Sequence, residues 1–375
     1  MDTYDAVIAG GGIIGASIAL ELAEAGLKVG LYDAREPGHE ASWASAGMIS
    51  PAPENPTMIP FMPMSLASVA LYPEFIRKVE ELTGANVGYR QGGALDVILD
   101  GNAQEELSTI IALQHGVGLR AEALSAEHAR QMEPALTEEM QAAIFRPDEA
   151  SLDTRAFTDA VLEAARRRGV KIFAGNAAKA TQKDGTRCKG LTLEKGQVGA
   201  KWTIIAAGCF SARIGGVEPY APVFPAKGQM MALRSVAVEI QHVIWLEHTY
   251  LVPRNDGRII AGSTIERTGF DHDVTAGGMK KILNEALQMV PGLANARIEE
   301  TWAGLRPDSP DHLPIIGPTD VEGLLIATGH FRSGILLAPV TARMIREWVT
   351  TQQVSVNWDR VNPMRFLEAR KTHGA

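Results

Sequence analysis

The sequence has little cysteine, no long apolar run and no excess of positive charge. Its two cysteines, Cys188 and Cys209, are too few for a disulfide framework and are typical of a reducing compartment. No stretch reaches the roughly 18 apolar residues that a membrane-spanning helix needs. The net charge of −8 is unlike that of a dedicated nucleic-acid binder. We therefore expect a cytoplasmic protein without a membrane span or a nucleic-acid partner.

The sequence also lacks a convincing set of metal ligands. Residues 271–273 and 308–312 each combine acidic residues with a histidine. Neighbouring residues on a strand point to opposite faces, however, and no two histidines have the i, i+4 spacing of a zinc-binding helix. We expect no metal site. The 375 residues, with a composition ordinary for a folded protein, predict two or three domains.

A glycine-rich motif near the N-terminus is the strongest signal. Residues 5–9 predict a short buried strand, and the hexapeptide Gly-Gly-Gly-Ile-Ile-Gly follows at 10–15. Residues 16–25 predict a helix that Gly26 ends, and residues 28–33 predict a second strand that ends in an acid. This strand–turn–helix–strand order with a terminal acid is the fingerprint of a dinucleotide-binding site.

Each residue of the fingerprint has a physical role. Gly10 permits the tight turn, Gly12 lets the backbone approach a pyrophosphate, and Gly15 lets helix and strand pack closely. The helix N-terminus supplies free N–H groups and partial positive charge for the phosphates. Asp33 is placed to bind ribose hydroxyls, and its charge would repel a 2′-phosphate, which disfavours NADP. The fingerprint alone leaves FAD and NAD both open.

The rest of the chain favours a flavin. Residues 201–208 and 323–329 predict apolar strands that end in glycine. Residues 330–339 begin as a loop and become helical near Ile335, so a helix N-terminus there can offer N–H groups to the pyrimidine end of a flavin. The five prolines of residues 50–64 exclude a regular helix or a central strand, so we expect a surface loop near the site.

Motifs along nearly the whole chain carry a resemblance to a known family: 10–15 with Asp33, 45–48, 206–208, 227–229, 248–254, 302–307 and 330–339. The chain resembles the D-amino-acid oxidase superfamily of FAD-dependent oxidoreductases, and within it most closely the glycine oxidases of thiamine biosynthesis. The resemblance implies an α/β fold in which a Rossmann-like FAD-binding domain is interleaved with an α+β substrate domain built on an antiparallel sheet. The FAD-binding domain would take residues 1–84, 146–218 and 308–375. The substrate domain would take residues 85–145 and 219–307.

The resemblance implies FAD as a non-covalent cofactor. Some oxidases of the superfamily hold the flavin through a cysteine near the position of residues 304–307, and no cysteine lies there. Read with the fingerprint, the resemblance places these residues against FAD: Gly10, Gly12, Ile13, Ile14, Gly15, Asp33, Ala34, Ala41, Ser42, Ala46, Gly47, Met48, Ala178, Gly208, Gly329, His330, Phe331, Arg332, Ser333, Gly334, Ile335 and Leu336.

An amino-acid oxidase needs a group that fixes the substrate carboxylate, because the flavin carries the redox chemistry. An arginine can grip a carboxylate through two parallel hydrogen bonds. The resemblance gives this role to Arg306. On the residues alone, the alternatives are an arginine at the surface and an ion pair of Arg306 with Asp308 or Asp311.

Three further residues complete the predicted catalytic set. Residues 248–251 predict a strand, so His248 and Tyr250 share one face. The resemblance assigns the Tyr250 hydroxyl to the carboxylate and places His248 near the cavity, with Ile265 in the cavity wall. Arg332 would lie between flavin and substrate, where its charge can contact the substrate or stabilise the reduced flavin.

The predicted reaction is the oxidative deamination of glycine or a similar small amine such as sarcosine or D-alanine. Hydride transfer to the flavin would give an imino acid, water would release ammonia, and oxygen would reoxidise the flavin to give hydrogen peroxide. The resemblance also implies a homotetramer or dimer. A dehydrogenase of the same fold that takes D-amino acids or 2-hydroxy acids and uses another electron acceptor is one alternative. A flavin-binding protein without turnover is another.

Overall fold

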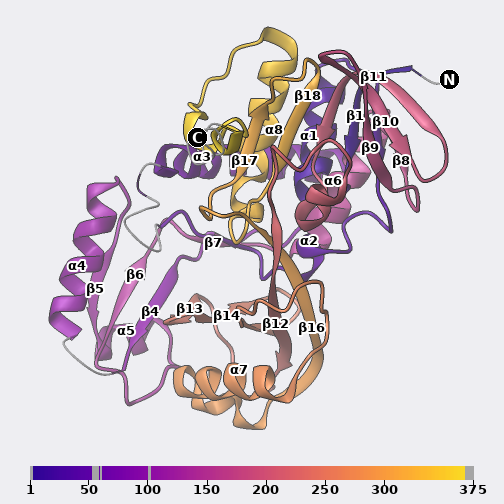
Figure 1. Ribbon diagram of the computed structural model, residues 1–375. Helices are drawn as coiled ribbons and strands as arrows, with labels where there is room; N and C mark the ends of the chain where they lie inside the picture. The colour runs from indigo at the N-terminus through magenta and orange to yellow at the C-terminus, as the bar shows by residue number, and fades with distance from the viewer. Residues whose placement is uncertain (1–2, 53–58, 60, 100–102, 368–375) are drawn as a thin grey trace.

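The computed structural model describes residues 3–52, 59, 61–99 and 103–367. Figure 1 shows two bodies, an upper one that holds both ends of the described chain and a lower one built on a broad sheet. Within the described residues, no helix combines the length and apolar character needed to cross a membrane. The helices are α1 (Ile13–Glu24), α2 (Ala41–Ala44), α3 (Met62–Thr83), α4 (Ala103–Gly116), α5 (Ala126–Met132), α6 (Thr154–Arg167), α7 (Ala276–Met289) and α8 (Gly334–Thr351), with 3₁₀ turns η2 (Gly208–Arg213), η3 (Pro291–Asn295) and η4 (Asp359–Val361).

The upper sheet has the strands β1 (Thr3–Ala9), β2 (Val29–Tyr32), β8 (Lys171–Phe173), β9 (Ala178–Asp184), β10 (Arg187–Leu193), β11 (Gln197–Ile205), β17 (Ile315–Pro318) and β18 (Leu324–Thr328). Its order is β17-β18-β11-β1-β2-β8, and β18, β11, β1, β2 and β8 run parallel. Strands β9 and β10 extend β11 as an antiparallel meander. Parallel strands need crossover connections that cover the sheet, and the strands β2 and β18 are accordingly buried along their whole length.

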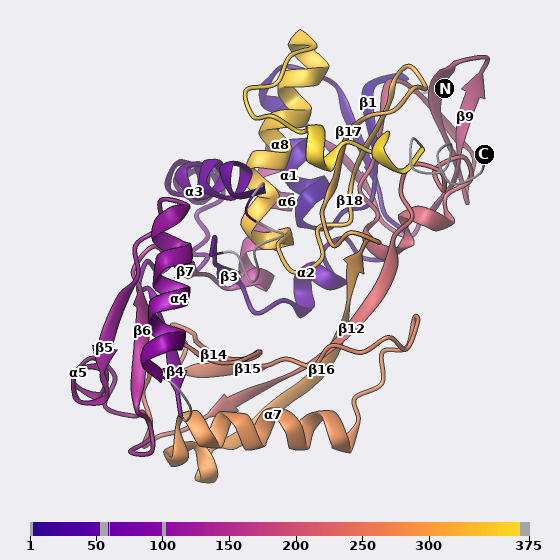
Figure 2. The ribbon, with the colours of Figure 1, turned by 60° about the vertical axis from the view of Figure 1, so that its left-hand side comes forward.

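Four helices pack together over this sheet and form its largest core. They are α1, α3, α6 and α8, and α3 packs against α6 and α8 on the side away from the strands, as Figure 2 shows for α3 and α8. Helix α6 begins after Asp153, whose carboxylate accepts hydrogen bonds from the N–H groups of Arg155 and Ala156. Helix α6 is therefore capped at its N-terminus, and its apolar face is buried.

The lower sheet has the strands β4 (Ala94–Ile98), β5 (Glu122–Ser125), β6 (Ala142–Arg146), β12 (Phe224–Arg234), β13 (Val243–Leu246), β14 (Thr249–Pro253), β15 (Arg258–Gly262) and β16 (Arg297–Asp308). Its order is β16-β12-β15-β14-β13-β4-β6-β5, and every neighbouring pair is antiparallel except β13 and β4. Helix α7 covers the outer face, where Ile282 and Ala286 join a buried cluster. The inner face carries Met230, Tyr250 and Trp302. A short pair, β3 (Met48–Ile49) and β7 (Ala150–Ser151), lies apart from both sheets.

The predicted fold class is confirmed: a parallel, helix-covered sheet is interleaved along the chain with a mainly antiparallel sheet. The lower sheet draws its strands from 94–146 and 224–308. The domain boundaries themselves stay a proposal. Of the expected loop at 50–64, residues 53–58 and 60 lie outside the described residues. The expectation was wrong at its end, because Met62 begins α3 with Pro63 in the first turn, where a proline removes no helical hydrogen bond.

Candidate functional site

A cavity of about 1020 Å³ runs between the two bodies. Its wall includes the β1–α1 turn, the N-terminus of α8 and the inner face of the lower sheet. The volume lies at the upper end of the range of about 300–1,000 Å³ that is usual for small-molecule sites. It therefore suits a large cofactor together with a small ligand.

The glycine-rich turn forms one end of the cavity. Gly10 has a φ of 107°, and a Cβ there would lie 2.3 Å from the carbonyl oxygen of Ala206. The first N–H of α1, from Ile13, donates to Ser42 Oγ at 2.9 Å, and the N-cap residue Gly12 has no side chain to cap the helix. Other N–H groups of the first turn therefore stay available for an anion, as a pyrophosphate cradle requires.

Asp33 lies beside this turn at the end of β2. Its carboxylate accepts hydrogen bonds from the N–H groups of Gly11 at 2.6 Å and Arg35 at 2.9 Å. Burial raises the pKa of Asp33, and the hydrogen bonds and the charge of Arg35 oppose that shift. Asp33, Ala34 and Ala178 all line this end of the cavity, where the fingerprint predicts the adenosine part of a dinucleotide.

Gly15 supports the turn from behind. A Cβ at this position would lie 2.0 Å from the carbonyl oxygen of Gly10. We expect Gly15→Ala to lower the free energy of unfolding by about 1–3 kcal/mol, the usual cost of overpacking, and to weaken FAD binding because the Gly10 turn must shift. Bound flavin per protein and thermal unfolding measure both effects. Gly277→Ala, in the first turn of α7 with no atom within 4 Å of its Cβ, is the matched control and should bind FAD normally.

The N-terminus of α8 forms the opposite wall. The helix begins at Gly334 without a side-chain cap from Ser333, and the N–H of Phe331 donates to the Pro307 carbonyl at 2.8 Å. That bond ties the loop before α8 to the end of β16. From the other side, the hydroxyls of Tyr72 and Ser68 on α3 bind the first carbonyls of α8. The loop and the helix N-terminus are thus fixed beside the cavity.

His330 in this loop is buried, and its Nε2 lies 3.1 Å from Thr341 Oγ1. Burial lowers the pKa of His330 to about 3, whereas the unfolded imidazole titrates near 6.5. Below pH 6.5 the imidazole of residue 330 therefore becomes protonated in the unfolded chain before it does so in the folded protein. This protonation stabilises the unfolded state relative to the folded state. Stability that is complete above pH 6.5 is lost as the pH falls towards 3.

We expect this single group to reduce the free energy of unfolding by about 1.4 kcal/mol between pH 7.5 and pH 5.5. Urea unfolding of the flavin-loaded protein at both pH values measures the change. His330→Leu should show a shallower pH dependence by that amount, and replacement of the exposed His128 should leave the dependence unaltered. Equal slopes in wild type and His330→Leu would contradict the assignment.

The substrate end of the cavity centres on Arg306 in β16. Its guanidinium donates to the Thr264 carbonyl at 3.1 Å and to Ser263 Oγ at 2.6 Å. Gly228 lies beneath it, because a Cβ on Gly228 would be 2.3 Å from Nη1 of Arg306. Half-buried Arg306 thus rests on the backbone of β12, with its head group at the cavity wall.

The alternative role of Arg306 is an ion pair with Asp308 or Asp311, and both of these carboxylates contact other basic side chains. Asp308 pairs with Arg267 at 2.6 Å and lies 2.9 Å from Nδ1 of His312. Asp311 pairs with Arg365 at 2.7 Å. Both carboxylates near Arg306 in the sequence thus have basic partners of their own.

Tyr250 lies on the inner face of the lower sheet. Its hydroxyl donates only a weak hydrogen bond, 3.4 Å long, to Met230 Sδ. Thr249 points the other way and binds Glu285 on α7. The strand begins one residue later than predicted, however, because His248 belongs to the two-residue turn Glu247–His248 between β13 and β14. His248 still lines the cavity, at its exposed rim.

The expectation for Ile265 was wrong. Its side chain is 46% exposed and does not line the cavity. Strand β15 ends at Gly262, and the next residues alternate: Thr264 and Glu266 turn inward and bind Gln229. Ile265 between them must therefore face outward.

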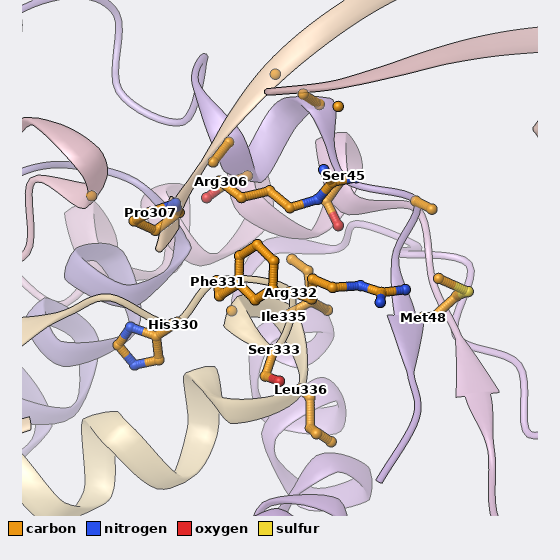
Figure 3. A pocket seen from close by; sticks show the side chains of 18 of the residues that line it. Ser45, Met48, Arg306, Pro307, His330, Phe331, Arg332, Ser333, Ile335 and Leu336 are labelled. Carbon is orange, nitrogen blue, oxygen red and sulfur yellow. The ribbon is translucent and has the colours of Figure 1, made fainter. Parts of the chain in front are cut away.

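Arg332 reaches the cavity from the loop before α8. Figure 3 shows Arg306 and Arg332 extending towards the segment that carries Ser45 and Met48. This segment is held by two motifs of the lower sheet. Trp302 Nε1 donates to the Ala44 carbonyl at 3.0 Å, and Arg254 Nη2 donates to the Ala46 carbonyl at 2.7 Å. Motif residues far apart in sequence therefore shape one wall.

Most predicted site residues line this one cavity. The exceptions are Gly15, Gly47 and Gly329, which support its wall through the backbone: a Cβ on Gly47, for instance, would lie 2.0 Å from the Leu152 carbonyl oxygen. The sequence reasoning missed several lining residues, among them Asp96, Arg146, Trp245, Phe210 and Arg213. Trp245 pairs with Tyr250 across the hairpin, so recognition of the two-residue turn could have found it.

The glycine-rich turn and the acid at the end of β2 have the arrangement of a dinucleotide-binding site, and the same cavity is lined by Arg306 and Arg332. The family pattern described as FAD dependent oxidoreductase matches residues 5–348. The chain belongs to this FAD-dependent oxidoreductase family, which confirms the prediction of FAD.

Individual relatives differ in their described roles. The chain is 35% identical to the bifunctional protein ThiO/ThiG of Synechocystis sp. over 97% of its own length, but it covers only 54% of that protein. It is 31% identical to the hydrogen cyanide synthase subunit HcnC of Pseudomonas aeruginosa, with 98% of this chain and 96% of that protein covered. The crystal structure of glycine oxidase from Geobacillus kaustophilus matches with a TM-score of 0.93 and 29% identity, covering 97% of this chain and 99% of that one. The chain thus spans about half the length of its ThiO/ThiG relatives.

Proposed function

We propose that this protein oxidises glycine or a similarly small amine, such as sarcosine or D-alanine. One observation carries the proposal: the head group of Arg306 lies in the same cavity as the dinucleotide cradle, supported by neutral acceptors on the lower sheet. An arginine in that position can bind a carboxylate through two charge-assisted hydrogen bonds. The match to glycine oxidase from Geobacillus kaustophilus over 97% of the chain supports the same substrate class.

In this proposal the side chains bind and orient the substrate. Arg306 fixes the carboxylate, and the Tyr250 hydroxyl turns from its weak bond with Met230 to give that carboxylate a further donor. Arg332 adds positive charge beside the flavin, which favours electron transfer towards it. The rim residue His248 borders the entrance. No general base is needed if the amine binds in its free form.

FAD would lie along the cavity from the Gly10 turn to α8, held without a covalent bond, and when bound it accepts a hydride from the substrate carbon. Loss of this hydride, which carries two electrons and one proton, and of a second proton from the nitrogen would turn the free amine into an imine, which water hydrolyses with release of ammonia. The two electrons and two protons would then convert oxygen to hydrogen peroxide. Glycine thus gives glyoxylate. The imine of glycine is also the form that thiazole synthesis for thiamine would consume, and we propose this pathway as the biological role.

Peroxide release by the purified, yellow protein tests the proposal. Glycine, sarcosine, D-alanine, D-proline, L-alanine and glycolate would each be supplied in air. Peroxide with glycine and sarcosine supports the oxidase. Bleaching of the flavin without peroxide indicates a dehydrogenase with another acceptor, an outcome that the similarity to hydrogen cyanide synthase subunit HcnC makes worth testing. Glycolate as the best substrate would point to a 2-hydroxy acid, and no response at all to a flavin protein without turnover.

Two finer points belong to the same proposal. Both cysteines are buried and unpaired, which supports a reducing, cytoplasmic location. A homodimer or homotetramer is expected from the resemblance, and the mass of the flavin-loaded protein in solution tests it.

A further inference from the structure

The head group of Arg306 is held by the short segment Ser263–Thr264. The proposed reaction gives this segment no direct role. The guanidinium is bound by Ser263 Oγ and by the Thr264 carbonyl, just beyond the end of β15. Both residues are almost fully buried. Because this segment has left the regular sheet, its position depends on side chains from the neighbouring strand β12.

Lys227 and Gln229 in β12 flank Gly228 and bind this segment from both sides. The backbones of Lys227 and Glu266 exchange two hydrogen bonds, at 3.0 Å and 2.9 Å. The backbone N–H of Gln229 donates to Thr264 Oγ1 at 3.0 Å. Thr264, whose carbonyl accepts a hydrogen bond from Arg306, is therefore held by its hydroxyl as well as by the neighbouring backbone hydrogen bonds.

Glu266 connects the side chains of this network. Its Oε1 accepts hydrogen bonds from Thr264 Oγ1 at 2.5 Å and from Gln229 Nε2 at 2.6 Å. Burial alone would raise the pKa of Glu266, but these hydrogen bonds and the charge of Lys227 hold it below its ordinary value. Glu266 is therefore a carboxylate at neutral pH.

Lys227 supplies the opposite charge. The residue is 1% exposed, and its Nζ lies 2.5 Å from Asp271 and 3.5 Å from Glu266. A buried ammonium is costly unless it is paired, so the strand, the segment and the following loop must keep this arrangement together. The sheet could hold an apolar residue at this position at lower cost, which indicates that Lys227 has a role beyond packing.

We propose that Lys227, Gln229 and Glu266 are positioning residues, which hold the Thr264 carbonyl and so fix the head group of Arg306 for the substrate carboxylate. The proposal rests on the carboxylate-binding role of Arg306 in the proposed function. It predicts that loss of the network weakens carboxylate binding without removing any group that touches the substrate.

The test uses Lys227→Met in the flavin-loaded protein, with acetate as a carboxylate probe that cannot be oxidised as an amine. Titration of the visible flavin spectrum gives the Kd for acetate, and peroxide release gives KM and kcat for glycine. We expect Kd and KM to rise at least about tenfold while kcat changes far less, since a misplacement of about 1 Å can cost up to a hundredfold. Gln229→Leu, which removes the bonds to Glu266 and Thr275, should act in the same direction.

A double-mutant comparison separates positioning from general stability. If Lys227 acts through Arg306, then Lys227→Met should have no further effect on acetate binding in an Arg306→Ala background. Arg234→Met is the control, because it removes another ion pair of the same β12–β16 ladder, with Glu299, far along the strands from Arg306. It should leave the Kd for acetate unchanged.

The outcomes for the two proposals are distinct. Acetate binding that depends on Lys227 only when Arg306 is present supports the network even if glycine is not oxidised, in which case the proposed reaction alone fails. Unchanged acetate binding in both Lys227→Met and Gln229→Leu would overturn the network, as would an equal loss in the Arg306→Ala background. A wild-type protein that does not bind acetate would overturn it together with the role of Arg306.

Discussion

Replacement of Arg306 by alanine is expected to lower kcat/KM for glycine by more than a hundredfold while FAD stays bound. A hydrogen bond to a charged group contributes about 1.5–3 kcal/mol, so loss of two such bonds to a carboxylate corresponds to at least about a hundredfold in rate. FAD should be retained because the cradle at Gly10 and the wall at α8 lie on other elements. Peroxide release gives kcat/KM, and the visible spectrum gives the flavin content.

Two further variants define what the loss means. Arg234→Ala removes an arginine from the same strand pair, β12 and β16, and should keep full activity because Arg234 pairs with Glu299 away from the cavity. Arg306→Lys keeps the charge but not the two-pronged geometry and should recover only part of the activity. Arg306→Ala with wild-type kcat/KM would remove the carboxylate role and return Arg306 to a structural one.

The features that could be predicted from the sequence depend on residues close together in the chain. The turn at 10–15 and the acid Asp33 form one βαβ unit, so their spacing already implies the cradle. Helix α6 likewise follows from its own apolar period and from the cap at Asp153. Such local signals need no knowledge of distant partners.

The missed features depend on distant pairings or on atypical turns. Glu247–His248 lacks the glycine or asparagine of a typical hairpin turn, so the sequence pattern predicts a strand that includes His248. Asp96 reaches the cavity because β4 pairs with β13, far along the chain, and only that register places it beside Trp245. No pattern within residues 94–98 carries this information.

The role of Gly228 could not be predicted from the sequence, because it depends on the space that a glycine leaves by having no side chain. In the sequence, the glycine only marks a resemblance. In the structure, the space that a Cβ would fill holds the guanidinium of Arg306, a residue 78 positions further along the chain. The glycine and the arginine therefore form one structural unit.

Gly228→Ala is expected to fold and bind FAD normally but to lose most of its activity towards glycine. Gly228 does not have a positive φ, and the three atoms nearest to a Cβ at this position would all belong to the Arg306 guanidinium, the closest at 2.3 Å. The flexible arginine can move away, so the cost in stability is small. The head group must nevertheless shift by about 1 Å, and a misplacement of that size can reduce kcat/KM by about a hundredfold.

The neighbouring Gly304 provides the comparison, because it pairs with Gly228 across the ladder. A Cβ on Gly304 would lie 2.4 Å from the Cβ of Ala44, on the part of the cavity wall where we propose that the flavin binds, rather than beside Arg306. Gly304→Ala should therefore weaken FAD binding, whereas Gly228→Ala should raise the KM for glycine with flavin content unchanged. The decisive measurement is Gly228→Ala combined with Arg306→Ala: no loss beyond that of Arg306→Ala means that the methyl group acts through the arginine, and an additional loss means that Gly228 serves the fold itself.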